Sequence, residues 1–238
     1  MRRGRWRALL LVGGVAALVI VLLGAFGSSA PSVSVGAPAS SSRLLPAGPP
    51  HPQVIALQGA LRLQLPVSQA RVTAIGYHAA GADALPLDPI GRQANEDLLS
   101  RIFHRIFGGG GKVGWYQLGG GEGPSTGAVD VGAPEGTSVY SPVEGVVVGI
   151  HDYVINGEKL GNVLEIQPQG SPDTVVAVSH LEADPSLAVG SPVTPGVSKL
   201  GRIIDFSGVE RQALAKHTQD AGNHVTLEVR PAPTGALN

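Results

Sequence analysis

Short apolar runs separated by glycine and proline dominate the second half of the chain. The stretch 127–148, GAVDVGAPEGTSVYSPVEGVVV, holds three such runs, divided by a Pro-Glu-Gly turn and by a second turn with proline. The same rhythm continues through GIHDYVI, GNVLEIQP, TVVAVSHLE and GNHVTLEV, with a turn signal at Asn156-Gly157. Such runs of Val, Ile and Tyr between Gly and Pro are typical of strands joined by tight turns. The pattern predicts a mainly β, antiparallel domain over residues 113–238.

Residues 53–112 show a different pattern, which predicts a small β-α segment leading into that domain. Val54–Tyr77 holds two apolar segments, VIALQGALRLQL and RVTAIGY, and favours a hairpin. Asp88-Pro89 has the character of a helix N-cap followed by proline at the first helical position. Apolar residues then recur at helical spacing from Ala94 to Phe107, until a run of glycines ends the helix. A second, shorter helix is expected at 209–220, VERQALAKHTQD.

The first residues combine positive charge with a long apolar run. Four arginines among the first seven residues precede Ala8–Phe26, which lacks charge and would form a helix about 28 Å long at ~1.5 Å per residue. We therefore expect residues 1–27 to be a membrane anchor, with the remainder of the chain extracytoplasmic. A signal peptide cleaved after Ser28-Ser29-Ala30 is the alternative and would give a secreted protein. Residues 28–52 are rich in Ser, Ala and Pro, which indicates an extended linker.

Composition narrows the possible chemistry. The chain has no cysteine, which excludes disulfides, cysteine nucleophiles, cysteine zinc sites and a lipidated cysteine. Setting the four N-terminal arginines aside leaves 13 of the 17 Lys and Arg against 18 Asp and Glu, so the rest of the chain carries about −5. A weakly acidic surface argues against a nucleic acid partner.

Five short motifs follow one another between Gly123 and Arg230. They are TGAVD (126–130), APEGTSVYSP (133–142), EGVV (144–147), SHL (179–181) and HVTLEV (224–229). In this order they resemble the catalytic domain of the M23 (LytM/lysostaphin-like) zinc metallopeptidases, which cut peptide cross-links in bacterial cell walls. The resemblance covers under half of the chain and implies an antiparallel β domain with an active-site groove.

The resemblance also implies a set of site residues. The family binds zinc through two histidines and one aspartate and leaves a position open for the attacking water. Asp130 stands at the aspartate position, but Thr126 and Thr226 stand where the family has its two histidine ligands. The two histidines that assist catalysis beside the metal correspond to His180 and His224. Threonine is a neutral, weak donor, so the resemblance predicts a degenerate zinc site.

Other interpretations of these residues stay open. His151 or His217 could complete a rearranged metal site. Without metal, Asp130 could serve only as a hydrogen-bond acceptor, and His180 and His224 as a buried hydrogen-bonded pair. Trp115 and Tyr116 lie between two glycine clusters, and their position in the resemblance suggests contact with a glycan or peptide.

These observations predict an M23-like protein anchored in the membrane and lacking catalytic activity. We expect it to bind peptidoglycan or to regulate a separate cell-wall hydrolase, with no cofactor. The alternative is an active metalloendopeptidase that cleaves peptidoglycan cross-link peptides with Zn²⁺ in a rearranged site.

Overall fold

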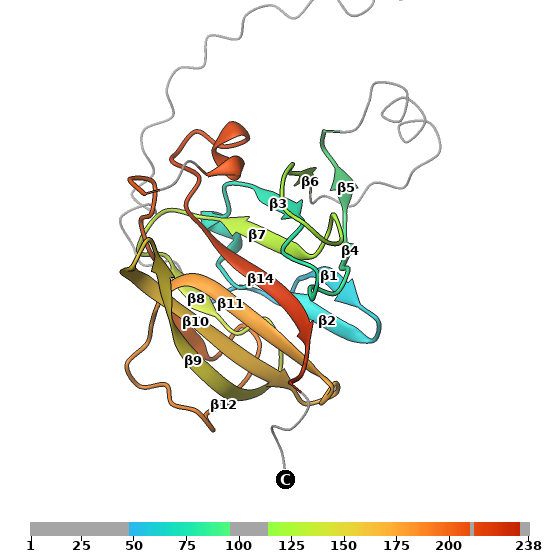
Figure 1. Cartoon of the computed structure of the whole chain (residues 1–238), viewed down its shortest axis with the longest axis vertical. Helices are drawn as coiled ribbons and strands as arrows, with labels where there is room; N and C mark the ends of the chain where they lie inside the picture. The colour runs from blue at the N-terminus through green and yellow to red at the C-terminus, as the bar shows by residue number, and fades with distance from the viewer. Residues whose placement is uncertain (1–47, 96–113, 210–211, 234–238) are drawn as a thin grey trace, which may run out of the picture. The chain divides into compact units, whose positions relative to one another are not determined.

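The computed structural model describes residues 48–95, 114–209 and 212–233 (Figure 1). The expected N-terminal helix, nearly all of the 28–52 linker and most of the expected helix 94–107 lie outside these ranges. Within them, no helix is long and apolar enough to cross a membrane.

Most strands belong to one large, mainly antiparallel sheet. Its order is β12-β9-β10-β11-β14-β7-β3-β6-β5. Off this path, β13 pairs with β11 and with β8. Only β6 pairs in parallel, with β3 on one side and β5 on the other. The strands are β3 (Ile75–His78), β5 (Arg92–Gln93), β6 (Gly114–Gln117), β7 (Ala128–Gly132), β8 (Ser138–Tyr140), β9 (Gly145–Ile155), β10 (Glu158–Pro168), β11 (Thr174–Ala183), β12 (Pro192–Val193), β13 (Lys199–Ile203) and β14 (His224–Pro231). The predicted mainly β, antiparallel fold is confirmed.

The β9–β10 hairpin shows how the local sequence sets the pairing. Asn156 and Gly157 form its tip with φ values of 52° and 84°. Positive φ at both residues gives the turn a twist that matches the strands, and Asn-Gly adopts it with little strain. The two strands pair from Glu158 opposite Ile155 to Pro168 opposite Gly145.

A small second sheet is formed by the N-terminal part of the described chain. Its order is β2-β1-β4, with β1 (Val54–Gln58), β2 (Leu61–Gln64) and β4 (Asp88–Pro89). The expected hairpin is therefore present as β1 and β2, whereas the RVTAIGY segment forms β3 in the large sheet. A short 3₁₀ helix, η2 (Gln69–Arg71), lies between β2 and β3.

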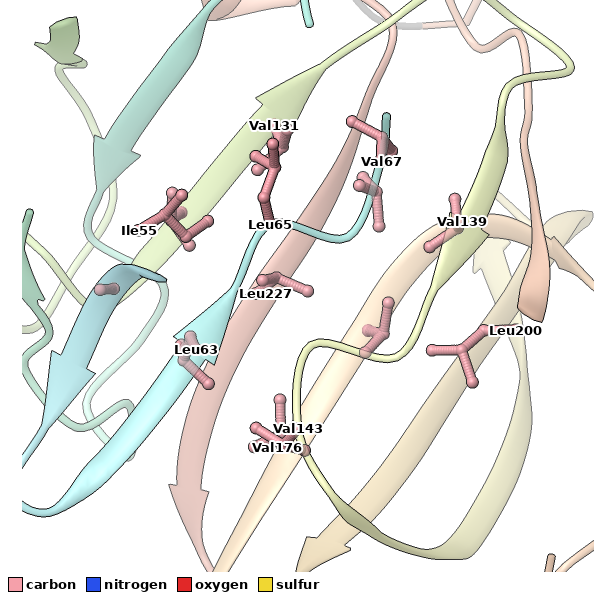
Figure 2. Close-up of a cluster of buried hydrophobic side chains, with 14 of the residues drawn as sticks. Ile55, Leu63, Leu65, Val67, Val131, Val139, Val143, Val176, Leu200 and Leu227 are labelled. Carbon is pink, nitrogen blue, oxygen red and sulfur yellow. The ribbon is translucent and has the colours of Figure 1, made fainter. Parts of the chain in front are cut away.

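One hydrophobic core joins the two sheets (Figure 2). Side chains from the N-terminal strands and the loop after them pack with side chains of the large sheet, and the members shown include Ile55, Leu63, Leu65, Val67, Val131, Val139, Val176, Leu200 and Leu227. All of these are at most 2% exposed. Burial of this apolar surface stabilises both sheets together.

One predicted helix start and one predicted helix are corrected. Asp88-Pro89 is a strand rather than a helix start, because Asp88 pairs with Leu57 and the N–H of Ile90 donates to the carbonyl of Ile55 at 2.8 Å. Tertiary pairing overrides the local cap signal. Over 209–220, the described residues form only the 3₁₀ helix η3 (Ala213–Lys216), because the backbone of Gln212 is still extended (ψ 131°).

Candidate functional site

The candidate site lies on four neighbouring strands in the middle of the large sheet. Asp130 on β7 faces Gly76 of β3 on one side and Thr226 of β14 on the other. Beyond β14, Ser179 of β11 pairs with Thr226, which places His180 next to it. The side chain of Asp130 is buried at 6% exposure. The sheet register therefore assembles a buried carboxylate with polar side chains from both adjoining strands.

A chain of hydrogen bonds runs from this carboxylate across β14 and β11. The Thr226 hydroxyl donates to Asp130 Oδ1 at 2.7 Å. Because a hydroxyl has one proton, His180 Nδ1, at 2.9 Å, must donate to Thr226 Oγ1. His180 Nε2 is then an acceptor, and the Tyr153 hydroxyl donates to it at 2.8 Å. Each hydrogen bond in this series therefore has its donor on the side away from Asp130 and its acceptor on the side toward it.

His78 approaches the same carboxylate from β3. Its Nδ1 lies 2.8 Å from the carbonyl oxygen of Ala79 and its Nε2 lies 3.1 Å from Asp130 Oδ1. Both neighbours are acceptors, so both ring nitrogens donate and the ring is positively charged. The hydrogen bond to Asp130, opposed by burial, raises the pKa of His78 to about 9.

The neighbouring groups shift the pKa of Asp130. Burial raises the pKa of Asp130, but the charge of His224 and the hydrogen bond from His78 outweigh burial and hold the pKa at about 2. Asp130 is therefore ionised at neutral pH, and its negative charge is compensated inside the fold.

The two remaining imidazoles lie against each other and against Phe206. His224 is 3% exposed, its Nδ1 donates to the carbonyl of Gly222 at 2.8 Å, and its Nε2 lies 3.5 Å from Asp130 Oδ1. The rings of His180 and His224 meet edge to face, with centroids 4.9 Å apart. Burial lowers the pKa of His180 to about 3, so this ring is neutral at physiological pH.

Four of the five residues that stand at the family's site positions thus come together: Asp130, Thr226, His180 and His224. The two histidines are connected through Thr226 and Asp130 rather than by a direct hydrogen bond. Thr126 lies just before β7, where its carbonyl accepts the N–H of Leu87 at 3.0 Å.

The two histidines suggested as substitute ligands lie elsewhere. His151 is an exposed residue of β9 whose Nε2 is 3.3 Å from Glu165. His217 stacks on Tyr116, with ring centroids 4.1 Å apart. Trp115 packs edge to face on Tyr77 at 5.1 Å. The suggested contact of Trp115 or Tyr116 with a glycan or peptide stays a prediction.

His78 is the site residue that sequence reasoning missed. It directly follows the apolar run RVTAIGY, outside the motif-bearing segment, and is 52 residues from Asp130. The one available signal was a histidine directly after a predicted strand, and that signal does not say which strand lies next to it.

The zinc ion implied by the resemblance does not fit these residues. No group of three or more His, Asp or Glu side chains in the described part of the chain could hold a metal ion. His78 pairs in register with Ala128, and His224 with Gly132, so the two imidazoles reach Asp130 from opposite strands and opposite ends. The residue directly across from Asp130 is Thr226, which is already a hydrogen-bond donor to it.

Comparison with known proteins gives distant structural likenesses. No family model and no curated protein matches the chain. Lysostaphin in solution matches at 16% identity over 45% of this chain and 37% of its own, with a TM-score of 0.33. Helicobacter pylori Csd3 matches at 20% identity over 74% of this chain and 34% of its own, with a TM-score of 0.36. A putative M23 peptidase from Pseudomonas aeruginosa matches at 23% identity, covering 48% of this chain and 41% of its own, with a TM-score of 0.31.

The chain spans about a third of the length of the lysostaphin and Csd3 structures that it matches. Likenesses at these identities and TM-scores assign no role to a residue and no activity to the chain. Among the three, one is named for the family that the five sequence motifs resemble. In its motif order and its mainly β fold, the chain is similar to the M23 peptidases.

Proposed function

We propose that this chain is an M23-like protein that binds peptidoglycan or regulates a cell-wall hydrolase without cutting wall peptides itself. The observation that carries the proposal is the state of Asp130, the one metal-ligand position kept from the family pattern. Its Oδ1 accepts hydrogen bonds from Thr226 at 2.7 Å and from His78 at 3.1 Å. It acts as the acceptor at the centre of a protein hydrogen-bond network.

The two histidines at the catalytic positions support the same proposal. A metallopeptidase needs a histidine with a free nitrogen that can exchange protons with the attacking water. The nitrogens of His180 are engaged by Thr226 and Tyr153, and burial lowers its pKa to about 3. His224 Nδ1 is engaged by Gly222. This arrangement is suited to holding side chains in fixed positions.

The N-terminal sequence supports a location outside the membrane for the proposed activity. The arginine-flanked apolar run of residues 1–27 would anchor the chain, and the Ser/Ala/Pro-rich linker 28–52 would hold the β domain away from the bilayer. The proposed contact surface is the part of the sheet over Asp130, His180 and His224, bordered by Tyr153.

The first test is the zinc content of the purified full chain, kept in mild detergent and dialysed against trace zinc. Elemental analysis should find far less than one zinc per chain. One tightly held zinc per chain would overturn the non-catalytic proposal and favour the alternative, an active peptidase with a rearranged site. Cleavage of wall peptides would then be the deciding assay.

The second test is co-sedimentation with purified bacterial sacculi. The chain should sediment with them, and Tyr153→Phe, which removes the hydroxyl that donates to His180, should weaken the binding. Tyr140→Phe on β8 is the matched control and should bind normally. If the chain does not sediment, the same variants are compared for activation of wall hydrolases, and a chain inactive in both assays refutes the proposal.

A further inference from the structure

Phe206 is a buried aromatic residue that covers two histidines of the candidate site. It follows β13 and is 2% exposed, yet neither hydrophobic cluster of the described chain includes it. Its ring packs instead on two imidazoles, with its centroid 4.6 Å from that of His180 and 5.2 Å from that of His224. Burial of this side chain therefore closes the site rather than filling the core.

We propose that residues 204–209, the closing segment, cover a peptide-binding surface formed by His180, Asn223 and His224, and leave it when a partner binds. The partner is an extended peptide that carries a carboxylate next to an apolar side chain. This inference rests on the proposed function, because it concerns the same contact surface. It adds the chemical class of the ligand and a step that controls access to the surface.

The closing segment is held as a peptide ligand would be. The N–H of Ile204 donates to the carbonyl of His180 at 3.4 Å. The next residue, Asp205, accepts a hydrogen bond from Asn223 Nδ2 at 3.0 Å through its carboxylate. The ring of Phe206 then packs on the imidazoles. Three successive residues thus use a backbone amide, a carboxylate and an apolar ring, which is the chemistry that a competing peptide would have to offer.

His180 is held in a strained conformation on the other side of these contacts. Its φ is 64°, in the left-handed region that residues other than glycine rarely adopt, although it lies within β11 rather than at a hairpin tip. From this position its carbonyl and its ring both contact the closing segment. Strain of this kind clusters at ligand-binding positions, where the surrounding structure maintains it.

Asn223 carries a buried acceptor that the closed arrangement leaves unsatisfied. The residue is 8% exposed, and its Oδ1 has no hydrogen-bond partner in the part of the chain that the structure describes. A buried amide oxygen without a donor destabilises the state that contains it. Because Nδ2 of the same amide holds Asp205, a peptide that offers an N–H beside its carboxylate would satisfy both ends of the amide.

Among the described residues, the closing segment makes few hydrogen bonds to the strands beneath it. Residues 207–209 are exposed, and the N–H of Val209 returns to the carbonyl of Phe206 at 3.0 Å in a local turn. The hydrogen bond from Ile204 to β11 is long at 3.4 Å. Segments with few such contacts open at lower free energy than paired strands do. The closing segment can therefore leave while β11 and β14 keep their pairing.

The first experiment observes the ring of Phe206 in the full chain, kept in mild detergent. The chain has four phenylalanines, so labelling with para-fluorophenylalanine gives four ¹⁹F signals, and Phe206→Leu identifies the one that belongs to Phe206. In the wild type this signal should barely shift when D₂O replaces H₂O, as for a buried ring. In Asp205→Ala, which removes the carboxylate held by Asn223, it should move toward the position of an exposed ring. Asp184→Ala loses equivalent hydrogen bonds to Ser186 and is the control that should leave the signal unchanged.

The second experiment measures binding to purified sacculi by co-sedimentation. A covered surface lowers the apparent affinity in proportion to the fraction of molecules that are open. Phe206→Ala and Asp205→Ala should therefore bind at least ~10-fold more tightly than the wild type, a difference of ~1.4 kcal/mol. Leu200→Ala removes a core side chain that is 0% exposed and should bind like the wild type, as should Asp184→Ala. Circular dichroism checks that each protein is folded.

A soluble probe tests the ligand class. The peptide IDFSGV, which repeats residues 204–209, should compete with sacculi for the Phe206→Ala protein. The same peptide with alanine in place of phenylalanine, or with asparagine in place of aspartate, should compete less. Equal competition by all three peptides would overturn the proposed ligand class.

Two further results would overturn the proposal. One is a wild-type Phe206 signal that shifts in D₂O as an exposed ring does, and the other is a folded Phe206→Ala protein that binds sacculi no more tightly than the wild type. If Phe206→Ala prevents folding, Asp205→Ala carries the same expectation. If the fluorine signal behaves as expected but no protein sediments, the closing segment covers the surface as proposed and only the proposed wall binding fails.

Discussion

The ion pair of His78 and Asp130 predicts that the protein loses stability between pH 6.5 and pH 9. The hydrogen bond to Asp130, against the effect of burial, raises the pKa of His78 from 6.5 to about 9. The folded protein holds this proton more tightly than the unfolded chain. The stabilisation is therefore complete below pH 6.5 and is lost as the pH rises through about 9.

The size of the effect follows from the shift in the pKa of His78. A pKa raised from 6.5 to about 9 corresponds to about 3 kcal/mol at ~1.4 kcal/mol per pH unit. A pKa of Asp130 lowered from 3.8 to about 2 corresponds to ~2 kcal/mol. The Asp130 value is smaller because burial of the carboxylate offsets part of the attraction. The Asp130 shift also comes from His224 and Thr226 and affects stability only at acidic pH, so the His78 value sets the loss between pH 6.5 and about 9, which we expect to be about 3 kcal/mol.

The assay is urea unfolding at pH 6.5, 8.0 and 9.5 at constant ionic strength. His78→Gln should be less stable than the wild type at pH 6.5, and the difference should shrink toward pH 9.5. His151→Gln, at an exposed position, should follow the wild type throughout. Ionisation of tyrosines in the unfolded chain affects all three proteins and cancels in the differences. A gap between wild type and His78→Gln that does not change with pH would refute the reasoning.

Three other predictions concern the same strands. Thr226→Val removes the hydroxyl between His180 and Asp130 and should lower the free energy of unfolding by ~1–3 kcal/mol, measured by urea unfolding. The control Thr174→Val loses one turn hydrogen bond and should lower it less. Gly76→Ala would place a Cβ 2.5 Å from Leu118 and should lower the stability measured by thermal unfolding by ~1–3 kcal/mol. The control Gly119→Ala has open space around the added Cβ and should change stability little. Because burial lowers the pKa of His180 from 6.5 to about 3, stability should fall as the pH drops below 6.5, and His180→Gln should weaken that fall.

The strands of the motif-bearing half were predictable because their signals are local. Alternating apolar runs with Pro and Gly between them predict β7, β8 and β9, and Asn156-Gly157 predicts the hairpin tip with its two positive φ values. The helix start expected at Asp88-Pro89 was wrong for the converse reason. The N-cap signal is also local, but hydrogen bonds to β1, some 30 positions earlier, decide the backbone there.

The site was predictable only as far as the family motifs reach. Asp130, His180, His224 and Thr226 lie within those motifs, and the structure brings them together. His78 does not, and its place beside Asp130 depends on β3 pairing with β7, which no spacing in the sequence specifies. The same limitation led to His151 and His217 as substitute ligands, since they were histidines without an assigned role and the sequence does not say which histidines lie near Asp130.

The position of the site on interior strands has a consequence for its motions. β3, β7, β14 and β11 each have neighbours on both sides within the sheet, and Asp130 and Thr226 sit opposite each other on two of them. Amide hydrogens in such strands exchange with solvent mainly when the whole domain unfolds. A partner of this surface would therefore meet one preformed arrangement of side chains. Binding would therefore be detected through the hydrogen-exchange rates of amides at the loops and hairpin tips. The amides of the site strands exchange too slowly for binding to change their rates measurably.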